Sequence, residues 1–97
     1  MDKKIRLTPD MDDETKILIT FLEIAPNRLK VFRTFQAEDI LRPKQISQIN
    51  NMYLTSVGKA LKQLNEKGLV DVLNPTVRAN RNFRLTKKGK IIRKYFK

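Results

Sequence analysis

The chain has 97 residues, of which 40% are hydrophobic and 32% charged, with a formal net charge of +11. This length suits a single domain with a modest core. Cysteine and histidine are both missing from the sequence, which excludes thiolate or imidazole zinc sites and catalysis by a Cys or His nucleophile.

The positive charge is concentrated in the last quarter of the chain. Residues 1–71 hold twelve basic and ten acidic side chains, whereas residues 72–97 hold nine basic side chains and no acidic one. Such a segment is typical of a surface that binds a polyanion. The sequence has neither an apolar run of membrane-spanning length nor an apolar leader segment. Without cysteine it can form no disulfide, which fits the cytoplasmic protein that we expect.

Residues 1–9 are expected to form a flexible or weakly extended arm, and residues 10–24 a first helix. Four apolar residues of that helix repeat with helical spacing and form one stripe: Ile17, Leu18, Phe21 and Leu22. Ile19 and Ile24 lie outside this stripe. Because one buried face does not need so much apolar surface, we predict that the stripe contacts a second copy in a symmetric homodimer.

The segment from 25 to 53 predicts two further helices. Pro26 suits the first turn of a helix, and the residues after it divide into an inward set of Leu29, Phe32 and Phe35 and a mostly outward set of Arg28, Lys30 and Arg33. Ile40 and Leu41 form a short apolar link or a minimal strand. Pro43 then begins a third helix, with Ile46 and Ile49 facing the core, and Asn50 and Asn51 suit a turn.

Residues 54–70, LTSVGKALKQLNEKGLV, predict a fourth helix followed by a strand. Its apolar residues recur at i, i+3, i+4 and i+7 and form one clean stripe: Val57, Ala60, Leu61 and Leu64. Gly68 suits the C-terminal end of this helix, and LVDVL after it predicts a strand.

The last part of the chain predicts a β-hairpin and a final helix. The loop NPTVRANRN, which carries Arg78 and Arg81, separates the strand LVDVL from a second strand, FRL. Thr86 can cap a helix over residues 86–97. The predicted apolar face of this helix is Ile91, Ile92, Tyr95 and Phe96, and Ile92 and Phe96 are candidates to extend the dimer contact.

The segment ISQINNMYLTSVGKALKQLNEKGLV resembles the helix-turn-helix core of bacterial and archaeal regulators of the ArsR and MarR type. In those families, the pattern ELA…LGLS…TVS..L..LE..GLV spans two helices and the first strand of the wing. Ile46 and Ser47 match its start, and Met52 matches the apolar residue of the turn. The remaining matches lie at the head and the exit of the second helix: Thr55, Ser56, Val57, Leu61, Leu64, Gly68, Leu69 and Val70.

Two flanking segments extend the resemblance to roughly residues 25–92. APNRLKVFRTF is similar to the preceding helix of ArsR-type proteins, and FRLTKKGK to the second wing strand and final helix of MarR-type ones. The resemblance implies a mainly α fold with a small β-hairpin, the winged helix-turn-helix, in one domain over residues 1–97. Residues 25–85 would be the helix-turn-helix core with its wing. Because the chain has no Cys or His, the metal sensing of ArsR-type proteins is not implied.

The implied function is sequence-specific binding of double-stranded DNA in transcription regulation. The recognition helix would enter the major groove, and the basic wing would contact the flanking backbone or minor groove. The candidate DNA-binding residues are Tyr53, Thr55, Ser56, Gly58, Lys59 and Lys62 at the helix, Arg78, Arg81 and Arg84 on the wing, and Lys87 and Lys88 after it. We expect no cofactor and no enzymatic activity, because the sequence holds no acid–base constellation and no phosphate-binding glycine loop.

The sequence allows two explanations for a glycine at position 58. A glycine near the start of the recognition helix lets the DNA backbone come close, at a cost of about 1 kcal/mol in helix propensity. It could instead let a neighbouring helix pack closely. Two alternatives to the whole function also remain open: a winged helix that docks proteins in a transcription or replication assembly, and a winged helix that binds RNA.

Overall fold

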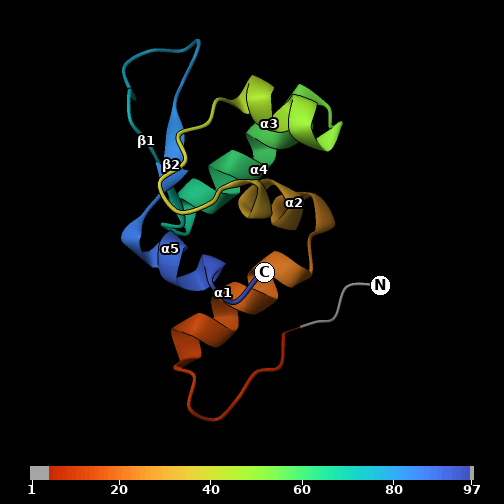
Figure 1. The fold of residues 1–97 in the computed structure, drawn as a ribbon, viewed down its shortest axis with the longest axis vertical. Helices are drawn as coiled ribbons and strands as arrows, with labels where there is room; N and C mark the ends of the chain where they lie inside the picture. The colour runs from red at the N-terminus through yellow and green to blue at the C-terminus, as the bar shows by residue number, and fades with distance from the viewer. Residues whose placement is uncertain (1–4, 97) are drawn as a thin grey trace.

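The computed structural model describes residues 5–96. Its elements follow the predicted order (Figure 1): α1 Asp13–Glu23, α2 Pro26–Thr34, α3 Pro43–Asn50, α4 Leu54–Glu66, β1 Val70–Val72, β2 Phe83–Leu85 and α5 Lys87–Arg93. The predicted fold class, a mainly α winged helix-turn-helix with one small hairpin, is confirmed. None of the described helices is long and apolar enough to cross a membrane.

The helix starts follow local signals that the sequence displays. Pro26 and Pro43 occupy first-turn positions in α2 and α3, where a missing N–H costs nothing. Asp12 caps α1 by accepting a hydrogen bond of 2.8 Å from the Thr15 N–H. Hydrogen bonds from Thr15 lower the pKa of Asp12, so this cap stabilises α1 above the ordinary Asp pKa and is lost as the pH falls below the lowered value.

The ends of α3 and α4 use a left-handed residue to turn the chain. Gly68 has φ +72° after α4. The Gly68 N–H donates to the Asn65 carbonyl, and the Leu69 N–H donates to the Leu64 carbonyl, both at 2.9 Å. Asn51, with φ +52°, plays the same part after α3. These bonds satisfy carbonyls that a helix end leaves without partners, and they confirm the predicted turns.

The wing is an antiparallel pair of short strands with a third segment at its edge. Val70 of β1 lies opposite Leu85 of β2, and Asp71 opposite Arg84. Leu41 forms an isolated bridge with Phe83, through two backbone hydrogen bonds of 2.9 and 2.8 Å. In the predicted link at Ile40–Leu41, Leu41 thus pairs as a minimal strand would, and this bridge ties the start of α3 to the wing.

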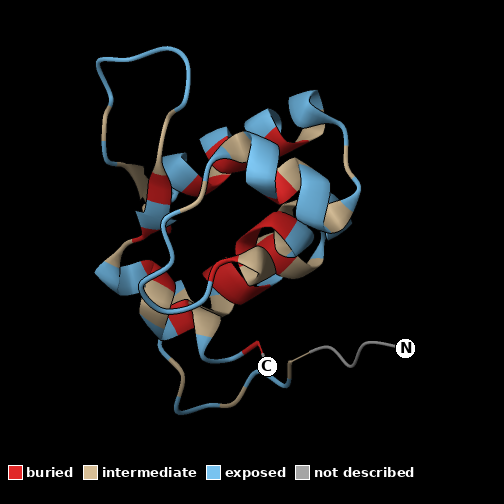
Figure 2. Cartoon of the chain, turned by 45° about the horizontal axis from the view of Figure 1, so that its top comes forward, coloured by how far each residue is buried: buried red, intermediate tan, exposed pale blue. Residues whose placement is uncertain are grey.

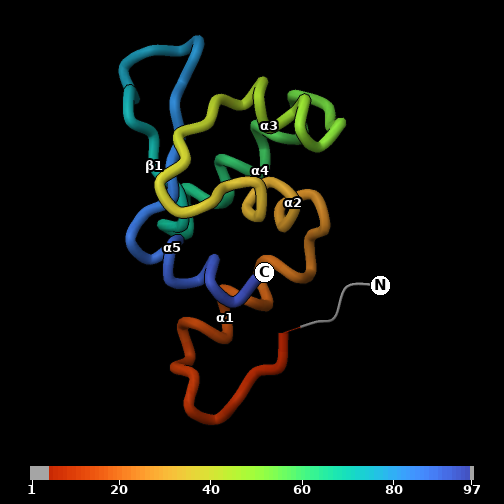
Figure 3. Tube along the Cα trace, viewed as in Figure 1, coloured from red at the N-terminus to blue at the C-terminus, as the bar shows by residue number. Residues whose placement is uncertain are grey.

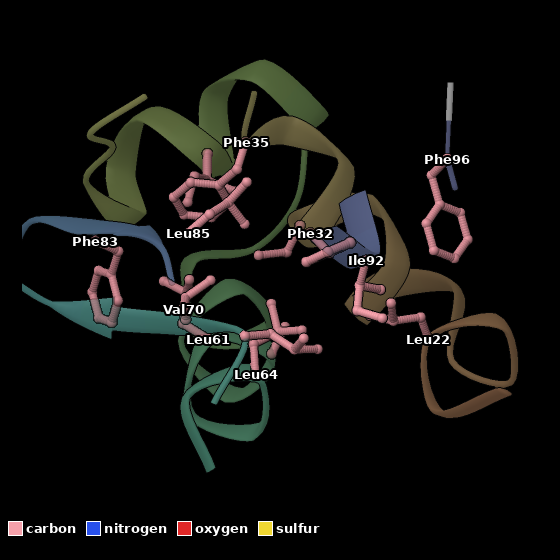
Figure 4. Packing of buried hydrophobic residues seen from close by; sticks show 14 of the residues in the cluster. Leu22, Phe32, Phe35, Leu61, Leu64, Val70, Phe83, Leu85, Ile92 and Phe96 are labelled. Carbon is pink, nitrogen blue, oxygen red and sulfur yellow. The ribbon is translucent and has the colours of Figure 1, made fainter. Parts of the chain in front are cut away.

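The core lies where α2, α4, the hairpin and α5 meet (Figure 4). Phe32, Phe35, Leu61 and Leu64 are fully buried, as their predicted stripes required. Buried residues face the centre of the molecule and exposed ones cover its outside and the wing loop (Figure 2).

The inward and outward faces of three helices differ from the prediction. Ile49 of α3 is 64% exposed and Ile91 of α5 is 51% exposed, whereas Ile19 of α1 is fully buried. In a short helix with apolar residues on more than one side, the packing of the neighbouring elements determines which side is buried. Since α1 packs against both α2 and α5, it buries two adjacent positions of its sequence.

Most of the predicted dimer contact is therefore used inside the single chain. Leu18 and Leu22 of α1, and Ile92 and Phe96 at the C-terminal end, are at most 7% exposed. Phe96 packs edge-on against Phe32, with ring centroids 6.0 Å apart. These four residues cannot form the dimer surface. Ile17 remains exposed.

Two arginines lie partly buried and bind backbone carbonyls. Arg28, predicted to point mostly outward, donates to the Phe21 carbonyl at 3.0 Å and to the Gln63 side chain at 3.1 Å. Arg93 donates to the carbonyls of Phe35 and Arg33 at 2.8 and 3.1 Å. Burial lowers the pKa of both guanidinium groups. Arg28 thus joins α1 to α4, and Arg93 joins α5 to the end of α2.

Part of the N-terminal arm contacts the domain. Residues 1–4 of the predicted arm at 1–9 lie outside the described part of the chain. Residues 5–9 form no helix or strand, but Ile5 packs against the core and its N–H donates to the Glu23 carboxylate at 2.8 Å.

The first turn of α5 lies directly against the chain that leaves α4. The Thr86 N–H donates to the Leu69 carbonyl at 3.1 Å, and its hydroxyl donates to the Gly68 carbonyl. The same hydroxyl accepts from the Gly89 N–H at 3.0 Å. A Cβ at position 89 would overlap the Leu69 carbonyl oxygen. Only glycine allows this approach, because the obstacle is backbone.

Gly89→Ala should therefore destabilise the domain by about 3 kcal/mol or more, at the upper end for overpacking. The matched control is Gly58→Ala, also in a helix, where an added Cβ would have no described atom within 4 Å apart from its chain neighbours and its own helix backbone. The control should hold or gain about 0.5–1 kcal/mol. Denaturant unfolding measures both, and equal stability of the two variants would contradict the close approach.

Candidate nucleic-acid interface

The outward face of α4 is open to solvent along its first three turns. Leu54, Thr55, Gly58, Lys59 and Lys62 are exposed. The opposite face, made of Val57, Ala60, Leu61 and Leu64, is at most 3% exposed. Gly58 lies in the middle of the open face, and beyond its chain neighbours and its own helix backbone a Cβ there would meet no described atom within 4 Å. The explanation in which Gly58 serves close helix packing inside the chain is therefore wrong.

A groove of about 780 Å³ runs between α4, the start of α3 and the wing loop. Gly58, Leu54 and Lys62 line it from α4, and Arg78 and Arg81 line it from the wing. Arg42 and Lys44 line it from α3. Five cationic side chains thus surround the groove, and within residues 5–96 no carboxylate lines it. We call these seven residues and the space between them the basic groove.

Hydrogen bonds within the loop hold the wing in shape. The Asn74 side chain accepts from the Asn82 N–H at 2.8 Å and donates to the Asn80 carbonyl at 3.2 Å. Arg81 donates through Nε to the Val77 carbonyl at 2.7 Å. Asn80 has φ +58°, which asparagine tolerates better than most residues. Arg81 therefore shapes the loop as well as lining the groove, whereas Arg78 is exposed.

The other predicted residues in and before α4 do not line the basic groove. Ser56 and Lys59 line a separate hollow with the start of α2, at Pro26 and Asn27. Tyr53 precedes α4 and is 85% exposed. The lysines at 59 and 62 thus flank the open face of α4 on two sides.

Three predicted cations do not join the basic groove. Arg84 pairs with Asp71 at 3.3 Å, and Lys88 pairs with Glu14 of α1 at 2.6 Å. Lys87 and Lys88 line a hollow between α1 and α5. The trace in Figure 3 places α5 at the opposite end of the hairpin from the wing loop. Proximity in the sequence had grouped these residues with the wing, but the strands carry them away from its tip.

Sequence reasoning missed Arg42 and Lys44. Both lie at least thirty positions from the wing loop in the sequence, and no spacing pattern links them to it. The bridge between Leu41 and Phe83 brings them beside the wing. The apolar link at Ile40–Leu41 was the one signal of that pairing. Within the described chain, no cluster of acidic side chains that could hold a metal ion is present.

The fold and the basic groove define a winged helix-turn-helix protein. Its structure is similar to that of reduced HlyU from Vibrio cholerae N16961, with a TM-score of 0.66, 14% sequence identity and coverage of 82% of each chain. This likeness shows the fold. No protein-family model and no curated protein sequence matches the chain.

Gly58→Ala and Gly58→Glu test whether the open face of α4 approaches DNA. The alanine variant should keep its stability, because space is available, but should bind duplex DNA more weakly because a methyl group separates the surfaces. The glutamate variant should fold and lose binding, because its carboxylate opposes the phosphates. Melting curves and gel-shift assays on both variants measure this. Normal affinity of Gly58→Ala would contradict a DNA-facing role for this position.

Proposed function

We propose that this protein is a sequence-specific double-stranded DNA-binding transcription regulator. The observation that carries the proposal is the basic groove, which five cationic side chains line without a lining carboxylate among the described residues. Phosphate contacts by Lys and Arg supply much of the affinity of proteins for DNA. The winged helix fold places these cations around the open face of one helix.

In the proposed complex, α4 lies in the major groove. Thr55 and Ser56, in its first turn, offer hydroxyls to phosphates or base edges, and Gly58 allows close approach. Arg78 and Arg81 contact the flanking backbone or the minor groove. Arg42 and Lys44 add phosphate contacts from α3. Arg84, Lys87 and Lys88 are outside this contact set, because their nearest partners are carboxylates or α1.

DNA is favoured over RNA and over a protein partner by the shape of the surface. The major groove of B-form DNA admits a helix, whereas that of A-form RNA is deep and narrow. One observation favours the docking alternative: Tyr53 and Leu54 are apolar and 85% and 54% exposed. The cations on both sides of these residues make a nucleic acid the better partner.

The wing contributes phosphate contacts that carry little base identity. Arg78→Ala should weaken binding to all duplexes similarly and flatten the slope of log affinity against log salt by about 0.9. Arg81→Ala should do the same and also loosen the loop, because its bond to the Val77 carbonyl is lost. Arg84→Ala, whose side chain pairs with Asp71, is the matched control and should leave the slope unchanged. Salt titrations of affinity for several duplexes decide this, and an unchanged slope in Arg78→Ala would remove the wing from the interface.

The protein is also proposed to act as a homodimer, through a surface that differs from the predicted one. Ile17 and Ile24 of α1 are 62% and 71% exposed, and they lie two turns apart on the same side of the helix. Phe21 lies between them, half-buried beneath Arg28, whose guanidinium carbon is 3.6 Å from the ring centroid. For the dimer to bind successive major grooves, the symmetric contact along this stripe has to hold the two α4 helices about 34 Å apart.

Ile17→Asp and Ile24→Asp should convert the dimer to a monomer with little change in stability, because both side chains are exposed in the single chain. Ile40→Asp, with Ile40 54% exposed outside α1, is the matched control and should stay dimeric. Light scattering at high micromolar concentration measures the mass. A monomeric wild-type protein under those conditions would end the dimer proposal.

A further inference from the structure

The helix-turn-helix exposes three large apolar side chains to solvent. Ile49 on α3, Tyr53 before α4 and Leu54 in its first turn are 64%, 85% and 54% exposed. Leu54 lines the basic groove together with Lys62 and Arg42. Exposed apolar side chains on a surface commonly mark a contact site. Because cationic side chains lie beside Leu54, the partner that fits this site carries negative charge next to an apolar group.

The same end of α4 lacks the side chains that read guanine and adenine most specifically. Residues 54–61 contain no arginine, asparagine or glutamine, the side chains that form bidentate pairs with those bases most often, along with lysine. Gln63, the next amide in the helix, accepts a hydrogen bond from Arg28 at 3.1 Å. The first two turns therefore offer hydroxyls, Lys59 and apolar surface.

Thymine is the base that presents an apolar group in the major groove, its C5-methyl. We propose that Leu54 and Tyr53 read thymine methyl groups, so that the duplex recognised by this protein carries thymines opposite the start of α4. This inference rests on the proposed function and names the base chemistry that α4 prefers. Lys62 and Arg42 would bind the phosphates on either side of the contacted thymines. Gly58, one turn after Leu54, would let α4 enter the major groove deeply enough for Leu54 to contact a methyl group.

The test removes only the methyl group. Duplexes enriched by the full chain from a random pool are remade with deoxyuridine at each thymidine in turn. Affinity should fall about fourfold at each contacted position, the value for burial of one methyl group, with an unchanged salt slope. In Leu54→Ala and Tyr53→Ala, the difference between the two duplexes should vanish at the position that the missing side chain contacts. Any effect of deoxyuridine on duplex stiffness would persist in the variants.

Ile40→Ala is the control, because Ile40 is as exposed as Leu54 and does not line the basic groove. It should keep the full difference between thymidine and deoxyuridine. Salt-dependent binding that is indifferent to the methyl group would overturn this inference and leave the proposed function intact. The absence of binding to any duplex would overturn both. If Tyr53 and Leu54 instead dock a protein or a second copy, their variants would bind both duplexes as the wild type does, which also overturns the inference.

Discussion

The contact between Gly89 and the Leu69 carbonyl is the constraint on which the arrangement of the wing depends. Both ends of the hairpin pass through this junction, since β1 begins directly after Leu69 and β2 ends directly before Thr86. Thr86 fastens the two ends with hydrogen bonds to Gly68 and Leu69. The chain leaving α4 and the chain entering α5 therefore cannot shift independently. α4 forms one wall of the basic groove and the wing forms another. The junction lies at the opposite end of the hairpin from the wing loop, and by fixing the hairpin to the end of α4 it limits how far the two walls can move apart.

The sequence predicts the elements well because their boundaries follow from single residues. Pro26, Pro43, Gly68 and Thr86 each act through their own backbone or a neighbour within a few positions, so they can be interpreted without knowledge of the fold. The rotation of the helices is harder to predict. Ile49 fits the apolar stripe of α3 as well as Ile46 does, and the packing of α3 against α2 and α4 buries Ile46 and leaves Ile49 exposed.

The candidate site divides in the same way. The sequence could predict that Gly58, Lys62, Arg78 and Arg81 share one groove, because the places of α4 and the wing loop are local properties of the sequence. Arg42 was missed because the pairing of Leu41 with Phe83 spans half the chain. Lys88 was included because a lysine pattern does not reveal a partner as remote as Glu14. The net charge of a segment can be counted from the sequence. The charge of a surface depends also on which carboxylates the fold brings close to its lysines and arginines.

The fold also separates charge along the length of the molecule. Five of the ten acidic residues lie between positions 10 and 23, where Lys16 is the one base, and α1 lies at the opposite end of the 42 Å long axis from the wing in Figure 1. The lysines of α5 beside α1 are offset by its carboxylates, as in the pair of Lys88 with Glu14, whereas no described carboxylate lines the basic groove. In the field of a polyanion, the end that carries the basic groove is therefore attracted more strongly, and encounters begin there. Orientation of this kind raises the association rate rather than the lifetime of a complex, and it weakens as salt shortens the range of the field.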